Sequence, residues 1–258
     1  MFTTCAFLES VDPGGVYNAL AAIADQHVRV SGDDLYVPEL NQIVLLSGGI
    51  ETAAEAFLRL TSPSLRGRSR FFVEPYNGAA AAAVEPGSPH AICDLRHAPL
   101  VLVPMEVLNA ETDSNPVAAQ IQWCIVWFAD GPTEEATGAM FSIGATGATT
   151  LVASAWTNVP LTLSEDLPRG RYAVVGMRAR AAGCVAARLV GIGWRWRPGV
   201  LGVDAQTDIE YEAFRYGGLG VFGEFEDTDM PSVDFLSISA DTAEDVVLDL
   251  VQLRAGPA

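Results

Sequence analysis

The stretch PMEVLNAETDSNPVAAQIQWCIVWFADG, residues 104–131, decides the fold class. From residue 119 to residue 129 every odd position is apolar, whereas the even positions change half-way from glutamine to apolar residues. Because side chains alternate between the two faces of a strand, this pattern predicts a β-strand with one face buried throughout. We therefore expect Trp123 and Trp127, which occupy odd positions, to lie in a hydrophobic core.

A second strand precedes this one. Residues 100–108 are mostly apolar, but Pro104 cannot donate a backbone hydrogen bond and therefore marks an edge or a bulge. The segment TDSNP, residues 112–116, is rich in turn-forming residues. The two strands are therefore predicted to form a β-hairpin.

Two segments follow a helical period instead. The first has a capping Asp12 followed by Pro13 at the first helical position, and its apolar residues are Val16, Leu20 and Ile23. The second has apolar residues with helical spacing at Ile50, Ala53, Ala54, Phe57 and Leu58. Almost all other segments read as strands and turns, so the prediction is an all-β fold with short helices.

The Gly- and Thr-rich run of residues 130–150 is the natural domain boundary. Each side of it holds enough strand candidates for a sandwich of about eight strands. We predict an N-terminal domain, residues 1–135, with an N-terminal helix, and a C-terminal domain, residues 136–258. Because no residue-level repeat relates the two halves, one larger sandwich is an open alternative.

Charge argues against a nucleic-acid partner. Half of the 258 residues are hydrophobic, the formal charge is −17, and all fifteen basic residues are arginines. Nucleic-acid surfaces rely on clustered Lys and Arg, and the one tight basic cluster, at Arg66, Arg68 and Arg70, is interpreted as a solvated loop. Direct sequence-specific binding of nucleic acid is therefore not expected.

The first residues and the cysteines bear on the cellular compartment. MFTTCAFLES has neither the basic region nor the apolar run of a secretory signal, and no segment is long and apolar enough for a membrane span. We expect synthesis in the cytoplasm. Since no C-x-x-C pair is present, the cysteines are predicted to be buried free thiols: Cys5, Cys93, Cys124 and Cys184.

Known catalytic motifs are missing. Without lysine, a Walker A loop, a Schiff-base site and a protein-kinase site are excluded. GLGVFG, residues 218–223, matches G-x-G-x-x-G, but no helix pattern follows, so its glycines are interpreted as positions of close backbone approach. His90 and His97, which flank Asp94, would point to opposite faces of a strand, and His27 is remote in sequence. No catalytic, cofactor-binding or metal site is predicted.

Two groups of residues are weaker candidates for binding. Acidic residues alternate along one predicted strand and crowd a nearby loop: Asp208, Glu210 and Glu212 on the strand, and Glu224, Glu226, Asp227 and Asp229 in the loop. They lack the ligand spacing of a calcium site and are interpreted as solvated. In GWRWRPG, Trp194 and Trp196 are expected on one strand face, either as a core or interface stripe or as contacts for a sugar or a partner.

Four strand-rich segments follow one another in this order: PLVLVPMEVLNAETDSNPVAAQIQWCIVWFAD, LPRGRYAVVGMRARAAGCVAARLV, WRPGVLG and RYGGLGVFGEFEDTDMPSVDFLSISADTAEDVVLDL. Over about residues 40–253 this texture of strands and turns resembles the major capsid proteins of tailless icosahedral viruses and bacteriophages, the double jelly-roll lineage. The resemblance implies two jelly-roll β-sandwiches side by side. It also implies homotrimers that act as pseudo-hexagonal capsomers of an icosahedral shell.

A virion location follows from this resemblance, with synthesis in the host cytoplasm, no enzymatic activity and no cofactor. Partners would be further copies of the chain, other capsid proteins and, in many members, an internal virion membrane. The alternative is a β-sandwich binding module, carbohydrate-binding or receptor-binding, with Trp194 and Trp196 as contacts. An enzyme of unknown type is a third possibility.

Overall fold

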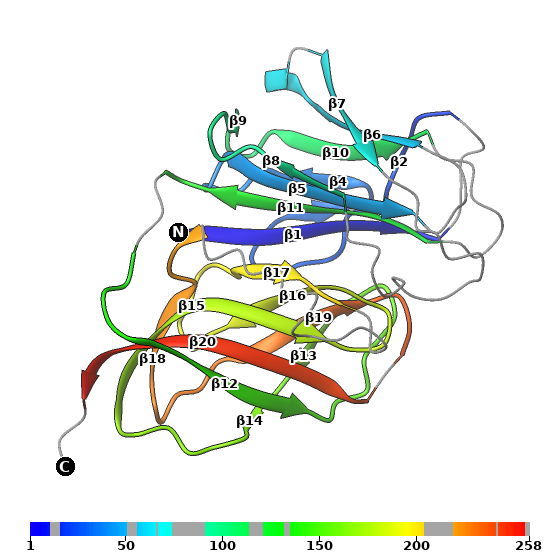
Figure 1. Cartoon of the computed structure of the whole chain (residues 1–258). Helices are drawn as coiled ribbons and strands as arrows, with labels where there is room; N and C mark the ends of the chain where they lie inside the picture. Colours follow the sequence, from blue (N-terminus) through cyan, green and yellow to red (C-terminus); the bar gives the residue numbers. More distant parts are fainter. Residues whose placement is uncertain are drawn as a thin grey trace. The chain divides into compact units, whose positions relative to one another are not determined.

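The computed structural model describes residues 1–10, 16–50, 56–65, 67–73, 91–113, 121–131, 135–203, 219–240 and 242–255. Within these residues the protein is all-β, and the strands form several antiparallel sheets (Figure 1). The helical content of the described residues is a single 3-10 turn, η1 (Pro63–Leu65).

Two compact units make up the chain. The N-terminal unit is Thr3–Asp130, and the C-terminal unit is Gly131–Ala258 together with Met1–Phe2. The division after Asp130 and the sequence-predicted boundary after residue 135 both fall in the connection between the last strand of one unit and the first strand of the next.

The N-terminal unit contains two sheets. In sheet N1 the strand order is β1-β11-β5-β8, with β9 also paired to β5. In sheet N2 the order is β3-β4-β10-β6-β7, with β2 also paired to β10. The strands of sheet N1 are β1 (Phe2–Glu9), β5 (Gln42–Ile50), β8 (Ala91–Asp94), β9 (Leu100–Val101) and β11 (Gln122–Ala129). Those of sheet N2 are β2 (Asn18–Ala19), β3 (Val30–Ser31), β4 (Asp34–Tyr36), β6 (Ala56–Ser62), β7 (Gly67–Val73) and β10 (Val107–Thr112).

The C-terminal unit also contains two sheets. Sheet C1 has the order β14-β12-β20-β15-β18, and sheet C2 has the order β13-β19-β16-β17. The strands of sheet C1 are β12 (Met140–Gly147), β14 (Thr162–Leu163), β15 (Gly170–Arg180), β18 (Gly223–Glu226) and β20 (Glu244–Ala255). Those of sheet C2 are β13 (Trp156–Val159), β16 (Cys184–Val190), β17 (Gly199–Leu201) and β19 (Ser232–Ser237).

The same strand order occurs in both units. In the N-terminal unit, β2 and β4 pair with different halves of β10 and together occupy one position beside it. When they are counted as one strand and the short β3, β9 and β14 are set aside, each unit has eight strands within the described residues. One sheet of each unit then has the order first, eighth, third, sixth, and the other has the order second, seventh, fourth, fifth.

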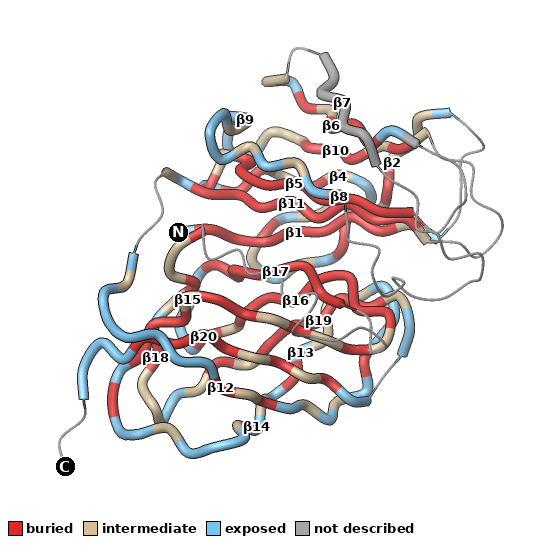
Figure 2. The backbone as a smooth tube through the Cα atoms, in the orientation of Figure 1, coloured by how far each residue is buried: buried red, intermediate tan, exposed pale blue. Residues whose placement is uncertain are grey.

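Strand β11 lies at the centre of the N-terminal core. It pairs with β1 on one side and with β5 on the other, and all eight of its residues are buried (Figure 2). Trp123 and Trp127 are both 0% exposed, so the prediction that they are core residues is confirmed. The face formed by the even-numbered residues is also buried along the whole strand. The sequence predicted burial of this face only in the second half of the strand, but Gln122 is already 0% exposed.

The predicted hairpin between residues 100–108 and β11 is wrong. Strand β10 pairs with β4 and β6 in sheet N2, whereas β11 pairs with β1 and β5 in sheet N1. The connection after Thr112 therefore carries the chain from one sheet to the other, and residues 114–116 of the expected turn lie outside the described residues.

The first predicted helix is also wrong over its described part, because residues 16–23 are not helical. The backbone N–H of Leu8 donates to the carbonyl of Ala21 (2.9 Å), that of Ile23 to Ala6 (2.9 Å) and that of Leu20 to Ala110 (2.8 Å). These long-range hydrogen bonds outweigh a local helical preference that is weak in a short segment. Asp12 and Pro13 lie outside the described residues.

The second predicted helix is replaced by strands. Ile50 ends β5 opposite Gln122 of β11, and Leu58 lies in β6 opposite Thr112 of β10. Ladder pairing on both flanks therefore overrides the helical spacing of the apolar residues. Ala53 and Ala54 lie outside the described residues.

We predict that Trp123→Ala lowers the free energy of unfolding by about 3–5 kcal/mol, because it leaves a cavity beside a side chain that is 0% exposed. Urea unfolding followed by circular dichroism measures the change. Val101→Ala is the control: Val101 is 60% exposed, so its truncation should change stability by less than about 0.5 kcal/mol. Equal stability of Trp123→Ala and the parent would contradict the core assignment.

Candidate functional site

Trp194 and Trp196 do not form the expected strand. Residues 191–198 connect β16 to β17 as turns and bends. Trp194 is half-buried, and its Nε1–H donates to the carbonyl of Glu224 (3.1 Å). Trp196 is 9% exposed, and the Arg195 guanidinium lies 4.6 Å from its ring centre. The two indoles therefore have different environments, and the shared strand face predicted for them is wrong.

Glycines position the Trp194 ring. A Cβ added to Gly191 would lie 2.1 Å from the ring, and a Cβ added to Gly223 would lie 2.3 Å from it. The sequence had suggested close approach at Gly223, and the structure shows that the neighbour is this indole rather than a backbone. Arg197 is buried and donates to the carbonyl of Trp194 (2.7 Å), which holds the connection in place.

Two described members of the acidic group, Glu224 and Asp227, have close polar partners. Glu224 pairs with Arg171 at 2.6 Å. The Asp227 carboxylate accepts a hydrogen bond from the backbone N–H of Gly170 (2.8 Å). Among the described residues no group of three or more His, Cys, Asp or Glu side chains is placed to hold a metal ion. Asp208, Glu210 and Glu212 lie outside the described residues.

Asp94 is also engaged in an ion pair. Arg96 donates to its carboxylate (2.6 Å), and this hydrogen bond holds the pKa of Asp94 at about 2. His90 lies outside the described residues, and so do the side chains of the basic cluster in and before β7. The prediction of free thiols is confirmed: Cys5, Cys124 and Cys184 are buried, and Cys93 is half-buried.

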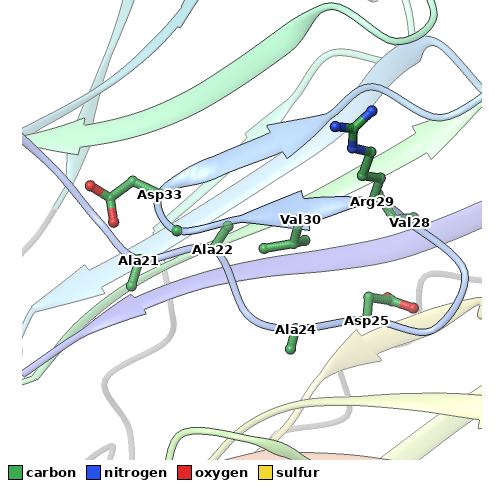
Figure 3. Close-up of a pocket in the computed structure, with 9 residues that line it drawn as sticks. Ala21, Ala22, Ala24, Asp25, Val28, Arg29, Val30 and Asp33 are labelled. Atoms are coloured by element: carbon green, nitrogen blue, oxygen red, sulfur yellow. The ribbon is translucent and has the colours of Figure 1, made fainter.

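An open pocket of about 600 Å³ lies beside β3 in the N-terminal unit (Figure 3). Alanines and valines make much of its wall, and Asp25, Arg29 and Asp33 supply its charges. Asp25 accepts a hydrogen bond from the backbone of His27 (2.7 Å), and Arg29 stacks on the ring of Tyr36 at 4.2 Å. Figure 3 shows the three charged side chains pointing in different directions, so they do not converge on one ligand atom.

A buried arginine organises sheet C2. Arg188 on β16 is 3% exposed and donates through Nε to Oδ2 of Asp234 on β19 (3.0 Å). Its guanidinium stacks on the ring of Trp156 on β13, 4.1 Å from the ring centre. Asn158 donates to the other oxygen of Asp234 (2.8 Å). The charge is thus paired on one side and covered by an aromatic ring on the other.

Sheet N2 contains the same combination. Arg59 on β6 is 6% exposed, donates to Glu111 on β10, and stacks on the ring of Tyr17 at 3.8 Å. Thr61 also reaches Glu111, with 3.5 Å between their oxygens. We call these two sets the aromatic–arginine–carboxylate clusters.

The two clusters occupy equivalent positions. In each unit the arginine lies on the fourth strand, directly opposite the carboxylate on the seventh strand: Arg59 opposite Glu111, and Arg188 opposite Asp234. The residue of the second strand that lies opposite each carboxylate is Ala19 in one unit and Asn158 in the other. The aromatic residue precedes it by two positions in both units, Tyr17 before Ala19 and Trp156 before Asn158.

Sequence reasoning missed both clusters. The available signal was an arginine between apolar residues on a strand, as in Leu58-Arg59-Leu60 and Ala187-Arg188-Leu189. The partners are far away in sequence: Asp234 is 46 residues from Arg188, and Glu111 is 52 residues from Arg59. Only the strand order brings them together.

The carboxylate of Glu106 holds the turn Val103–Glu106 in place. The backbone N–H of Glu106 donates to the carbonyl of Val103 (3.1 Å), and Met105 has φ +68°, as at the third position of a type II turn. A residue other than glycine in this left-handed backbone conformation destabilises the folded state by about 1–3 kcal/mol. The Glu106 carboxylate accepts hydrogen bonds from the backbone N–H of Val103 (3.0 Å) and from the Ser64 hydroxyl (2.8 Å), which fix the turn.

Burial alone would raise the pKa of Glu106, but the hydrogen bonds from Val103 and Ser64 outweigh burial and lower it. A carboxylate with a lowered pKa stabilises the fold in full above its unfolded pKa of about 4.3. This contribution is lost as the pH falls through the pKa of the folded state.

We predict that Glu106→Gln destabilises the protein by about 1–3 kcal/mol at pH 7, because charge-assisted hydrogen bonds to the turn are lost. The difference from the parent should shrink as the pH is lowered below about 4. Denaturant unfolding at several pH values measures both effects, with Glu135→Gln, at an exposed position, as the control. A difference that does not change with pH would contradict this role of the carboxylate.

For the clusters, we predict that Arg188→Ala costs about 3–5 kcal/mol, because it leaves the carboxylate of Asp234 largely buried without its ion-pair partner. Arg171→Ala is the matched control: its pair with Glu224 is exposed, so the loss should not exceed about 1 kcal/mol. Chemical unfolding of the two variants measures the difference. If both variants lose the same free energy of unfolding, the buried cluster stabilises the fold no more than an exposed ion pair does.

No protein-family model matches the chain, and no curated protein matches it. Among the described residues no helix is long and apolar enough to cross a membrane.

Proposed function

We propose that the protein is a structural virion protein, the major capsid protein of a double jelly-roll virus. The observation that carries the proposal is the strand order, which is the same in both units. Antiparallel sandwiches of eight strands, arranged as two Greek keys, are jelly rolls, and viral capsid proteins are among their main users. First-eighth-third-sixth in one sheet and second-seventh-fourth-fifth in the other is the order expected of a jelly roll.

The equivalent clusters support the same interpretation. Arg59 and Arg188 are both buried on the fourth strand of their unit, opposite a carboxylate and stacked on an aromatic ring. The carboxylate is Glu in one unit and Asp in the other, and the ring is Tyr in one and Trp in the other. A chain with two units of one design supplies two similar building blocks. Three such chains supply six, so that threefold symmetry approximates the sixfold packing that a hexagonal shell needs.

The alternative, a carbohydrate-binding or receptor-binding module, receives less support. Sugar recognition of this kind uses aromatic ring faces that are open to solvent. Trp196 is buried, and the Trp194 ring packs against the backbone at Gly191 and Gly223. Lectin domains and cupins share the jelly roll, but neither observation places a ligand beside these two tryptophans.

In this proposal the function of the chain is assembly rather than catalysis. The chain would be made in the host cytoplasm, form homotrimers, and then build the virion shell with other capsid proteins, in many such viruses around an internal membrane. Copies with a formal charge of −17 repel one another, and salt screens this repulsion. Assembly should therefore increase with ionic strength.

We predict that the purified protein has three times the 27.3 kDa chain mass, or a multiple of that trimer, by light scattering after size-exclusion chromatography. Raising sodium chloride from about 0.05 to 1 M should favour the assembled species, since the Debye length falls to about 3 Å. Electron micrographs should show pseudo-hexagonal particles. A stable monomer at all salt and protein concentrations would rule the proposal out.

A further inference from the structure

Residues 22–32 form a wide loop around the open pocket of the N-terminal unit (Figure 3). The backbone N–H of Ala22 donates to the carbonyl of Gly32 (3.2 Å), and this hydrogen bond closes the loop at its base. Beyond this bond the two arms separate, with Ala24 and Asp25 on one arm and Val30 on the other. The pocket is the space between the two arms, and we call it the loop pocket.

One arm of the loop is the edge of a sheet. Strand β3 (Val30–Ser31) is the terminal strand of sheet N2. The N–H of Tyr36 donates to the carbonyl of Arg29 (2.9 Å), which makes these two residues a hydrogen-bonded pair of the β3–β4 ladder. Hydrogen-bonded and non-hydrogen-bonded pairs alternate along an antiparallel ladder, so Val30, opposite Leu35, directs its own N–H and C=O away from β4. These groups face the loop pocket, whose wall includes Val30.

Small apolar side chains leave the loop pocket open. Its volume of about 600 Å³ is in the range of pockets that hold ligands. Ala24 is exposed, Val30 is half-buried and Val28 is buried, so the wall is apolar from its rim to its floor. A strand that enters the pocket would therefore find backbone groups at one side and space for its side chains.

The charges that the loop pocket offers are acidic. Asp25 and Asp33 both line it, and Figure 3 shows them apart from each other, at different ends. Arg29 points away from Ala24 and Asp25, and its guanidinium stacks on the ring of Tyr36 at 4.2 Å. The formal charge of −17 attracts basic partners and repels a second copy of the chain.

We infer that the loop pocket binds an extended, basic segment of another protein, which adds as a strand to the edge of β3. Backbone hydrogen bonds to Val30 supply affinity, as in other cases of strand addition. Basic side chains on the segment meet Asp25 and Asp33 in charge-assisted contacts. Because the two carboxylates are apart, they suit a chain that spans the pocket better than a single ion. This inference does not depend on the proposed assembly.

A short peptide tests the inference on the complete protein. The probe is a capped hexapeptide of alternating valine and arginine, and its counterpart has glutamate in place of arginine. Isothermal titration calorimetry should detect binding of the arginine peptide with a dissociation constant below about 1 mM, weaker binding as sodium chloride is raised, and no binding of the glutamate peptide.

Variants of the protein locate the binding site. Asp25→Asn should weaken binding about three- to tenfold, and its amide oxygen can still accept the hydrogen bond from the backbone of His27. Ala24→Trp should abolish binding, because the indole fills the pocket from an exposed position. Asp166→Asn is the matched control: Asp166 is an exposed aspartate of the C-terminal unit, and its replacement should leave binding unchanged. Circular dichroism checks that each variant folds.

Variants of the peptide test strand addition itself. N-methylation removes backbone donors, and alternate residues of a strand direct their donors to opposite sides. One peptide is methylated at its three valines and another at its three arginines, and at least one of them should bind about tenfold more weakly or worse. Hydrogen exchange should slow in residues 22–32 when the unmethylated peptide binds.

Each other result overturns the inference in a different way. No binding of the arginine peptide at about 1 mM, or binding that Ala24→Trp leaves intact, excludes the loop pocket as its site. If spermine competes as strongly as the peptide and N-methylation has no effect, the pocket takes small cations and strand addition is wrong. If Asp25→Asn changes the oligomeric state of the protein alone, the occupant is a second copy. The mass measurement that tests the proposed function is independent of all these results.

Discussion

Pairing between the first and the last strand of each unit is the interaction on which the rest of the structure depends. In the C-terminal unit β12 pairs with β20, and Ser142 and Asp249, a hydrogen-bonded pair in this ladder, are 107 residues apart. In the N-terminal unit β1 pairs with β11 in the same way. Each last strand then has a hydrogen-bonded neighbour on both sides. Because these contacts close long loops, the pairing of the first and last strands should form late in folding.

The aromatic–arginine–carboxylate clusters depend on this closure. Burying an arginine in a sheet is unfavourable unless a carboxylate pairs with it and its remaining surface is covered. Asp234 and Trp156 meet both needs for Arg188, and they come from strands on the same side of it in the sheet order. That both units use this combination at one register indicates that strand order constrains the choice of side chains, although the two halves share no visible sequence repeat.

Assembly and stability place different demands on the surface. In the proposed assembly, copies with a formal charge of −17 would repel one another, so contacts between copies would need segments without charge or paired ions. Glu106 shows how the fold makes such a segment available: its carboxylate points toward backbone amides and Ser64, whereas the neighbouring apolar side chains face solvent. The Glu106 carboxylate thus shapes the turn, and its side chain is only partly exposed.

Period-two patterns in the sequence determined by themselves that the chain is all-β and that Trp123 and Trp127 are core residues, because alternation reports burial locally. The sequence could not determine which sheet a strand joins. β10 and β11 are neighbours in sequence yet belong to different sheets, because backbone ladders form between strands that are distant in the chain. Tertiary pairing also overrode the helical spacing near Leu20 and Leu58, and the turns around Trp194 replaced a predicted strand. The clusters around Arg59 and Arg188 were decided only by the tertiary structure, since the groups that neutralise a buried charge are chosen by proximity in space and not by spacing in sequence.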